Sequence, residues 1–487
     1  MSDLKAKLQD ILARTEANNR WRQRQCINLI PSETTPSLIV KMCEISDPAG
    51  RYAEHRTLKG KEIYFYQGTD FIRDVEEELR AAMREYFNCK EAELRTISGQ
   101  MANEVVFKAM TKYVNAGAGD EAAGKAGGAM RRMRLVMNND LTKGGHLSSQ
   151  PMGALFNFID ADPATGKEAV LNFPVRQDNP YKIDGPAMAA LIKERKPDLS
   201  VFGKSMFISR EPVAEARAAA ETLSPRPVIM YDMAHTLGLY GAFQTPLEEG
   251  ADIVTGSTHK TFFGPQRGVV VSNFEKGHQF RKVWTEVRSR AFPGSTSNHH
   301  LGTLLGLLVA THEMNAFKGA YQTQVRKNAK AFAAALKAHG LDVEGDPADG
   351  YTDTHQVIVR VRKYGTGEEV ARRLENNNII CNYQALPDDP SFIESSGIRT
   401  GVQEMTRFGM VEKDFDPVAG LVADAVIKGA DVKPEATELR SRFLEMKFCL
   451  PPADSAEMAA RVLESAFPTS AYAKSFAEHL GKLGTSY

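Results

Sequence analysis

Short apolar runs alternate with segments of helical periodicity through the middle of this chain, and this alternation limits the possible folds more than any other feature. The runs are RLVM, LSVFG, VIMYD, DIVTG and GVVVS, at residues 134–137, 199–203, 228–232, 252–256 and 268–272. Each is short and bounded by polar or turn-forming residues, as expected for a strand buried on both faces. Strands that alternate with helices predict a largely parallel sheet with helices on both of its faces.

The length of 487 residues exceeds what one hydrophobic core usually serves, so we expect more than one domain. We predict an N-terminal helix and arm at 1–66, a large domain at 67–315, and a smaller α+β domain with a helical tail at 316–487. The Gly- and Ala-rich stretch 115–130 is expected to be a flexible insertion. It nearly fits a phosphate-binding P-loop, but Ala126 stands where that loop needs a hydroxyl for magnesium.

The composition narrows the class of protein. Lys+Arg and Asp+Glu both number 61, so no basic excess favours nucleic acid or a membrane surface. The five cysteines are scattered without a C-x-x-C pair, which is typical of reduced cytoplasmic thiols rather than of a disulfide framework or a zinc site. The longest apolar stretch, 301–311, is too short to span a bilayer. We expect a soluble cytoplasmic protein without a metal site.

Two charged residues are expected at the ends of buried strands. Asp232 ends the run VIMYD, and Lys260 follows DIVTG in the stretch TGSTHKTFFGPQRG. The carboxyl ends of parallel strands meet at one edge of a sheet, where ligands bind. A salt bridge would explain the pair. The alternative is a pyridoxal phosphate (PLP) site, in which a lysine bonds to the cofactor aldehyde and a carboxylate keeps the ring nitrogen protonated.

A possible phosphate site precedes both residues. Ser98, Gly99 and Gln100 open the helical stretch TISGQMANEVVFKAM. Free N–H groups at a helix N-terminus attract an anion, although a simple helix cap would give the same pattern. The order phosphate loop, acidic strand end and lysine favours the PLP interpretation.

From about residue 25 to about residue 430 the chain resembles the serine hydroxymethyltransferases. The matching stretches, in the order of that family, are INLIPSETTPS, RYAEH, YQGTDFI, ISGQMAN, KGGHL, DMAH, STHKTFFGP, AFPG and SSGIRTG. The resemblance implies the α/β fold of PLP-dependent transferases of fold type I, which is aspartate-aminotransferase-like. Such a fold has a large, mixed but parallel-rich sheet domain and a smaller α+β C-terminal domain.

The resemblance also implies roles for individual residues. Lys260 would carry PLP, Asp232 would pair with its ring nitrogen, and His146 would stack on its ring. The other residues implied to contact the cofactor are Ser98, Gly99, Gln100, Ser205, His235, His259, Ser297 and Asn298. Those implied to bind the substrate are Ser32, Tyr52, Glu54, Tyr66 and Arg399, and the implied catalytic set is Lys260, Glu54, Tyr52, His146, Asp232 and His235. Because the N-terminal arm serves a neighbouring subunit in this family, the resemblance implies a homodimer or homotetramer with shared active sites.

Several positions depart from the pattern of the family. FPGSTSN places Ser297 and Asn298 where two glycines are usual, and GPQRG replaces GPRGG. Leu141 and Leu147 keep the apolar wall of a folate site, whereas Gln384 replaces an asparagine that would face the pterin. Similar departures occur in α-methylserine hydroxymethyltransferases and threonine transaldolases.

The predicted function is PLP-dependent interconversion of serine or α-methylserine with glycine or alanine, with tetrahydrofolate as the one-carbon acceptor. The alternative is a folate-independent aldolase or transaldolase that acts on β-hydroxy amino acids. A non-catalytic cofactor-binding protein is the remote third possibility, and it requires Lys260 or Glu54 to be dispensable.

Overall fold

A seven-stranded sheet lies at the centre of the larger part of the protein. The computed structural model describes residues 2–59, 61–116, 132–161, 165–466 and 469–483. The strand order is β4-β10-β9-β8-β7-β5-β6. The strands are β4 (Glu91–Glu93), β5 (Val136–Asn138), β6 (Val170–Asn172), β7 (Leu199–Gly203), β8 (Val228–Asp232), β9 (Ile253–Ser257) and β10 (Gly268–Ser272). All neighbours from β9 to β6 are parallel, whereas β10 is antiparallel to β9 and to β4, so the sheet is mixed and mostly parallel, as predicted.

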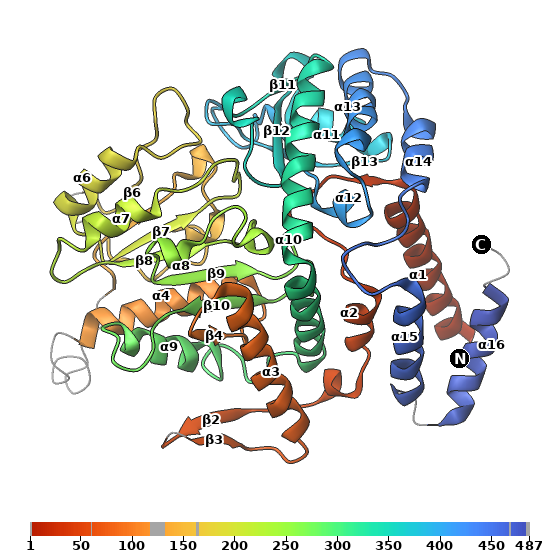
Figure 1. Cartoon of the computed structure of the whole chain (residues 1–487), viewed down its shortest axis with the longest axis horizontal. Coiled ribbons are helices and arrows are strands. Elements are labelled where there is room, and N and C mark those ends of the chain that lie inside the picture. The colour runs from red at the N-terminus through yellow and green to blue at the C-terminus, as the bar shows by residue number, and fades with distance from the viewer. Residues whose placement is uncertain (1, 60, 117–131, 162–164, 467–468, 484–487) are drawn as a thin grey trace.

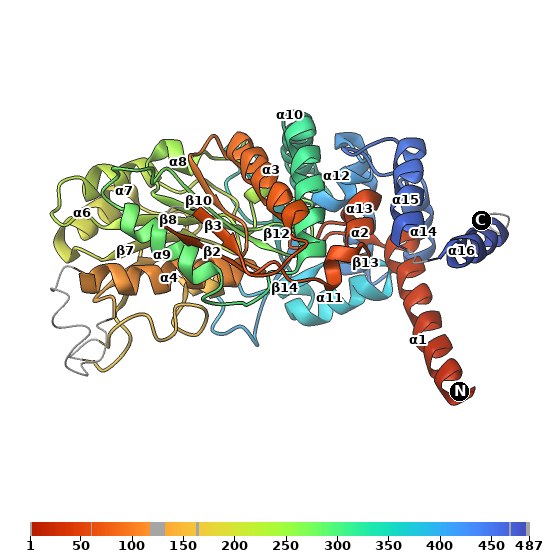
Figure 2. The same cartoon turned by 90° about the horizontal axis from the view of Figure 1, so that it is seen from below.

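Helices cover both faces of this sheet (Figure 1; Figure 2). One face carries α4 (Gly99–Ala116) and α9 (Arg281–Ala291), and the other carries α3 (Asp70–Phe87), α6 (Gly185–Arg195), α7 (Val213–Ala220) and α8 (Pro246–Glu249). Val228 and Met230 of β8 pack with the first group, and Ile229 and Tyr231 pack with the second. Because side chains alternate between the faces of a sheet, a strand covered on both faces must be apolar throughout.

One long helix, α10 (Leu301–Ala338), leads from the large sheet to the C-terminal part (Figure 1). There, four antiparallel strands have the order β11-β12-β15-β14. They are β11 (Asp342–Val343), β12 (Gln356–Arg360), β14 (Asn382–Gln384) and β15 (Gly397–Gly401), accompanied by α11 (Gly367–Asn376), α12 (Gln403–Arg407) and α13 (Phe415–Ala423). The proposed boundary between residues 315 and 316 falls inside α10, because the apolar run 301–311 belongs to the same helix as the amphipathic stretch after it.

The N-terminal segment contains strands and a second helix in addition to the predicted N-terminal helix. It comprises α1 (Ser2–Arg20), β1 (Ile27–Asn28), α2 (Leu38–Cys43) and a hairpin of β2 (His55–Leu58) and β3 (Lys61–Tyr64). β1 pairs in parallel with β13 (Ile379–Ile380), so the beginning of the chain is attached to its C-terminal part. The hairpin projects beyond α3 at the lower edge of the view in Figure 1.

The chain ends in helices, as predicted: α14 (Lys433–Ser441), α15 (Pro452–Ala466) and α16 (Ser470–Leu483). Most of the predicted insertion, residues 117–130, lies outside the described residues. Within the described part of the chain, no helix combines the length and the apolar character needed to cross a membrane.

Candidate active site

Lys260 lies just beyond the end of β9, beside the end of β8. The parallel pairing of these strands aligns Asp232 with Thr255, so both charged residues lie at the same edge of the sheet. Lys260 Nζ is 3.3 Å from His235 Nε2, and no carboxylate among the described residues forms an ion pair with it. Burial lowers the pKa of Lys260 to about 8, with Asp232 opposing the shift. The simple salt-bridge explanation for this pair is therefore wrong.

Asp232 is held by three donors instead. It is 1% exposed, and its Oδ2 lies 2.5 Å from His146 Nδ1 and accepts a hydrogen bond of 2.8 Å from Asn103 Nδ2. Its Oδ1 accepts from the backbone N–H of Ala234 at 2.9 Å. Burial alone would raise the pKa of Asp232, but the charge and hydrogen bond of His146 and the other donors outweigh burial and lower it. The buried carboxylate is thus kept ionised.

Sequence reasoning missed Asn103. Its amide oxygen accepts from Thr255 Oγ1 at 2.6 Å, and its nitrogen also donates to Ser148 Oγ at 2.7 Å. It therefore links α4 to β9 and to the loop that carries His146. A buried polar residue four positions after Gly99, in the apolar stretch MANEVVF, is the signal that could have identified it.

The Ser98–Gln100 stretch forms the start of α4, as predicted. Ser98 Oγ accepts from the N–H of Met101 at 3.1 Å, which caps the helix. A Cβ atom at Gly99 would lie 2.1 Å from Ser257 Oγ, so only glycine lets α4 approach the end of β9 this closely. Ser98 and Gln100 are exposed. The first N–H groups of a helix have no acceptor within the helix itself.

Arg399 approaches the same site from the C-terminal sheet. It lies on β15, is 7% exposed, and donates from Nη1 to the backbone oxygen of Ser205 at 2.7 Å. Its Nε donates to Asn382 Oδ1 at 3.3 Å, and no carboxylate of the described residues pairs with it. Burial lowers the pKa of Arg399 to about 10, which leaves it protonated at neutral pH. A buried guanidinium without an anion suits the carboxylate of a bound ligand.

Further residues complete this inner region. His235 is buried, its ring lies 5.6 Å from that of His146, and Gln356 Nε2 is 3.5 Å from its Nδ1. Burial, then the charge of Lys260, lowers the pKa of His259 to about 4, and its buried Nδ1 has no partner in the described structure. Gln356 and Asn382 were also missed, because they reach the site only through the packing of the two sheets.

We call Lys260, Asp232, His235, His146, Ser205 and Arg399 the inner group. Ser32 lies near its Arg399 side, since the adjacent Pro31 accepts from His355 Nε2 at 2.9 Å and lies against Gly401. Leu141 and Leu147 flank His146 in sequence and are 36% and 51% exposed. Lys143 joins this segment to the loop after Gln384 by a hydrogen bond of 2.6 Å to the backbone oxygen of Pro387.

A second set of predicted site residues lies elsewhere, and we call Tyr52, Glu54, Tyr66, Ser297 and Asn298 the outer group. Tyr52 and Tyr66 are 47% and 44% exposed, with ring centroids 5.4 Å apart. Asn298 Nδ2 donates to the backbone oxygen of Arg51 at 2.7 Å, so the loop after α9 lies beside the segment that leads into the hairpin. Within the described structure, no hydrogen bond or ion pair joins the outer group to the inner group of the same chain.

Comparisons with known proteins identify relatives of the whole chain. The profile of the family described as serine hydroxymethyltransferase matches residues 4–422. A serine hydroxymethyltransferase from Sulfolobus acidocaldarius is 36% identical over 470 residues, which cover 95% of this chain and 99% of that protein. One from Archaeoglobus fulgidus is 38% identical over 436 residues, which cover 87% and 89%. The crystal structure of L-threonine transaldolase from Pseudomonas fluorescens matches with a TM-score of 0.76 and 26% identity, over 94% of this chain and 99% of that one.

These matches confirm the predicted family, the fold-type-I architecture and a PLP-dependent transferase. They support hydroxymethyl transfer between serine and glycine, or related aldolase chemistry. With a family match over residues 4–422 and relatives above 30% identity along most of their length, the chain belongs to the serine hydroxymethyltransferase family.

Proposed function

We propose that this protein transfers a hydroxymethyl group between serine or α-methylserine and tetrahydrofolate. The observation that carries the proposal is the buried Arg399, which lacks an anionic partner in the described structure and lies beside the Lys260 and Asp232 site. A protonated guanidinium in that position suits the carboxylate of an amino acid.

The inner group fits PLP. Lys260 has no ion-pair partner among the described residues, and its lowered pKa of about 8 leaves a substantial neutral fraction that can bond to an aldehyde. Asp232 is an ionised carboxylate in a dry site, suited to a protonated ring nitrogen. The start of α4, at Ser98–Gln100, offers N–H groups to a phosphate. When bound, PLP supplies an electron sink for bond cleavage at the amino acid Cα.

The protein residues then orient the substrate and move protons. Arg399 binds the carboxylate with two parallel hydrogen bonds, while Asn382 holds its Nε. His146, which bonds to Asp232, would cover one side of a bound PLP ring. Glu54 moves the proton of the substrate hydroxyl. Tyr52 and Tyr66 line the substrate position beside Glu54, and Ser32 contacts the carboxylate.

Glu54 and the rest of the outer group act in a neighbouring subunit. Tyr52, Tyr66 and Ser297 are exposed and Glu54 and Asn298 are half-buried, and within the described structure none of them forms a hydrogen bond or ion pair with the inner group of its own chain. We therefore propose a homodimer at least, in which each site combines the inner group of one subunit with the outer group of the other.

The second candidate is a folate-independent aldolase or transaldolase on β-hydroxy amino acids. The match to L-threonine transaldolase favours it, since that match covers 99% of the other chain. The exposed Leu141 and Leu147 favour the folate-dependent reaction instead, because they offer an apolar surface to a flat ring beside His146.

Glycine added to the PLP-loaded protein, with and without tetrahydrofolate, tests the proposal. A long-wavelength absorbance band that grows when tetrahydrofolate is added supports a coupled folate site. If glycine alone changes the spectrum and tetrahydrofolate has no effect, the folate-dependent assignment is wrong, and aldehydes should be tested as acceptors.

A further inference from the structure

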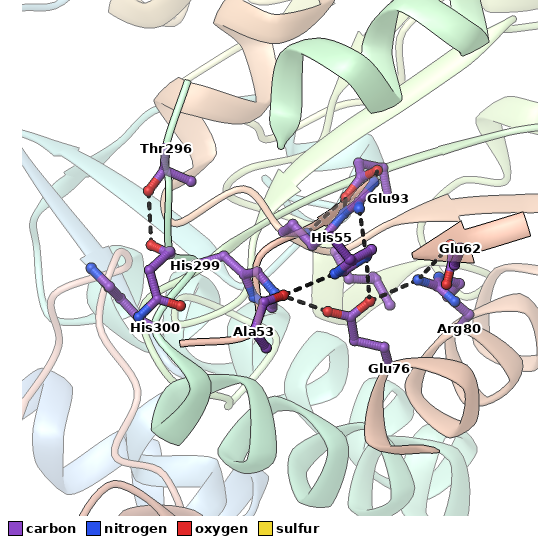
Figure 3. A network of polar contacts seen from close by, with 12 residues as sticks. Ala53, His55, Glu62, Glu76, Arg80, Glu93, Thr296, His299 and His300 are labelled. Carbon is purple, nitrogen blue, oxygen red and sulfur yellow. Dashed lines mark hydrogen bonds and ion pairs between the residues drawn. The ribbon is translucent and has the colours of Figure 1, made fainter. Parts of the chain in front are cut away.

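A buried network of charged side chains lies against the two segments that carry most of the outer group, residues 50–58 and residues 292–300 (Figure 3). Glu76 on α3 is at its centre and is 2% exposed. Its Oε1 lies 2.9 Å from His299 Nε2, and its Oε2 accepts from Arg80 Nη2 at 2.8 Å and lies 3.4 Å from His55 Nε2. His55 follows Glu54 directly, and His299 follows Asn298 directly. One carboxylate therefore lies next to both segments, and the hydrogen bond that it accepts in the described structure comes from Arg80.

Glu76 is ionised in this position. Burial would raise the pKa of Glu76, but its contact with His299 and the positive charge of Arg95 outweigh burial and lower it to about 2. Burial lowers the pKa of His299 in spite of the adjacent carboxylate, whose Oε1 lies 2.9 Å from its Nε2. An ionised carboxylate buried at this depth must be paired, and the groups that pair with it become fixed.

The hairpin side of the network is fixed by a second chain of contacts. His55 Nδ1 donates to the backbone oxygen of Ala53 at 2.9 Å, which leaves Nε2 to accept from Arg95 Nη1 at 3.0 Å. Arg95 is held in turn by Glu93 through Nε and Nη2, at 2.8 and 2.6 Å. The ring of His55 stacks on Tyr64, with centroids 4.3 Å apart. The backbone on both sides of Glu54 is thereby anchored.

The loop 292–300 is held by Arg267 and by the packing of Phe292. The buried Arg267 donates to the backbone oxygen of His300 at 3.0 Å, to Thr303 Oγ1 at 2.9 Å and to the backbone oxygen of Leu94 at 2.9 Å. It also donates to the backbone oxygen of His299. The ring of Phe292 lies 5.3 Å from that of His55 and 5.1 Å from that of His299. Phe292 thus fills the space between the histidines of the two segments.

Acidic and basic side chains from several elements pair within this network. Arg80 Nη2 also lies 3.6 Å from Glu62 on β3, and Glu62 accepts from Arg288 of α9 at 3.0 Å. The carboxylates of Glu62, Glu76 and Glu93 thus face Arg80, Arg95 and Arg288. Removal of the central charge leaves cations without a counter-charge where the two segments meet.

We propose that Glu76 is a positioning residue that holds Tyr52–Glu54 and the loop 292–300 together, so that both enter the neighbouring active site as one unit. This inference rests on the proposed function, in which Glu54 moves a proton in a neighbouring subunit, and on the cofactor contacts that the family resemblance implies for Ser297 and Asn298. Glu76 itself touches neither substrate nor cofactor. It sets where Glu54 stands relative to Ser297 and Asn298.

Glu76→Gln in the PLP-loaded enzyme tests this role, with Glu78→Gln as the matched control. Glu78 lies on the same helix, and its Oε1 is 2.9 Å from His312 Nε2, but both partners are more than half exposed. In Glu76→Gln, amide hydrogen exchange in 50–58 and in 292–300 should become faster together, by about tenfold, as expected for the loss of a buried charged contact. In Glu78→Gln neither segment should change.

The kinetics separate positioning from a general loss of stability. In Glu76→Gln we expect kcat to fall by about tenfold, a small change in the KM of the amino acid, and an unchanged cofactor spectrum. Faster exchange in one segment only, or in α3 and the central strands as well, would overturn the proposal.

His299→Gln provides a second test, because it leaves Glu76 paired with Arg80. It should also loosen both segments, and loosening of 292–300 alone would show that they are independent. Glu54→Gln separates the proposed function from the proposed role of Glu76. Full activity in Glu54→Gln refutes proton transfer by Glu54, whereas the hydrogen-exchange results test the coupling of the two segments independently.

Discussion

The inner and outer groups differ in how completely one chain builds them. In the inner group, Asp232 is 1% exposed and its carboxylate accepts from Asn103, His146 and the backbone. In the outer group, Tyr52 and Tyr66 are almost half exposed. The hydrogen bonds of Asn298 go to Arg51, beside the hairpin, and to Thr296 in its own loop. The ends of neighbouring strands position the inner group. The buried network around Glu76 positions the segments of the outer group. The difference is consistent with the proposal that each subunit folds its own inner group and receives its outer group from a neighbouring subunit.

Replacement of Lys260 tests the inner group most severely. Lys260→Ala should remove the covalent attachment of PLP, and activity should fall by at least about a thousandfold, as for the loss of a nucleophile. The visible absorbance of the dialysed protein measures the attachment. Lys276→Ala, at an exposed lysine, is the control and should retain both. Retention of a covalently bound cofactor in Lys260→Ala would contradict the assignment.

Arg399→Ala should weaken substrate binding while leaving the cofactor in place. Loss of a buried, charge-assisted pair of hydrogen bonds should raise the KM for the amino acid by about a hundredfold. Arg372→Ala, at an arginine whose side chain is 69% exposed, should have no effect. An unchanged KM in Arg399→Ala would mean that the substrate carboxylate binds elsewhere.

The lowered pKa of Lys260 predicts how PLP attachment depends on pH. The neutral amine is the reactive form, and burial lowers the pKa of this amine to about 8 from the ordinary 10.5. The rate of attachment to the apoprotein should therefore fall by about tenfold for each pH unit below 8 and level off above it. Stopped-flow absorbance measures this rate. A rate that keeps rising to pH 10 would show that the lysine has an ordinary pKa.

Two members of the inner group, Asp232 and Lys260, were accessible to prediction because local sequence determines their positions. Asp232 and Lys260 follow apolar runs whose ends a parallel sheet brings together, and Ser98 and Gly99 precede a helix. Arg399 has no such local signal and was identified only through the resemblance to the family. The residues Asn103, Gln356 and Asn382 were missed, since each acquires its role through a partner more than 15 positions away.

The support of the outer group could not be predicted for a similar reason. Glu76 reads as an ordinary polar position of an amphipathic helix, and His299 as a loop residue. Only the packing of α3 against the hairpin and the loop shows that Glu76 is buried. In the same way, the irregular composition of the N-terminal arm conceals β1, which depends on β13 for its hydrogen bonds.

Mixed dimers test the comparison between the groups directly, although the expected change is the smallest. Lys260→Ala and Glu54→Gln should each be nearly inactive alone. If each site takes its inner group from one subunit and its outer group from the other, a mixed dimer has one intact site, formed by the lysine of the Glu54→Gln subunit and the glutamate of its partner. The purified mixed dimer should then have about half of the wild-type activity, because one of its two sites is intact.

The matched control is a mixture of Lys260→Ala with Arg399→Ala, which damages the inner group of both subunits and should restore nothing. Activity is measured after the two chains are co-expressed and the mixed dimer is purified by two different tags. Recovery only in the first mixture requires that Glu54 act across the interface. If neither mixture recovers activity, the hairpin reaches the inner group of its own chain. The outer group would then have to move on substrate binding, because no hydrogen bond or ion pair joins the two groups in the part of the chain described.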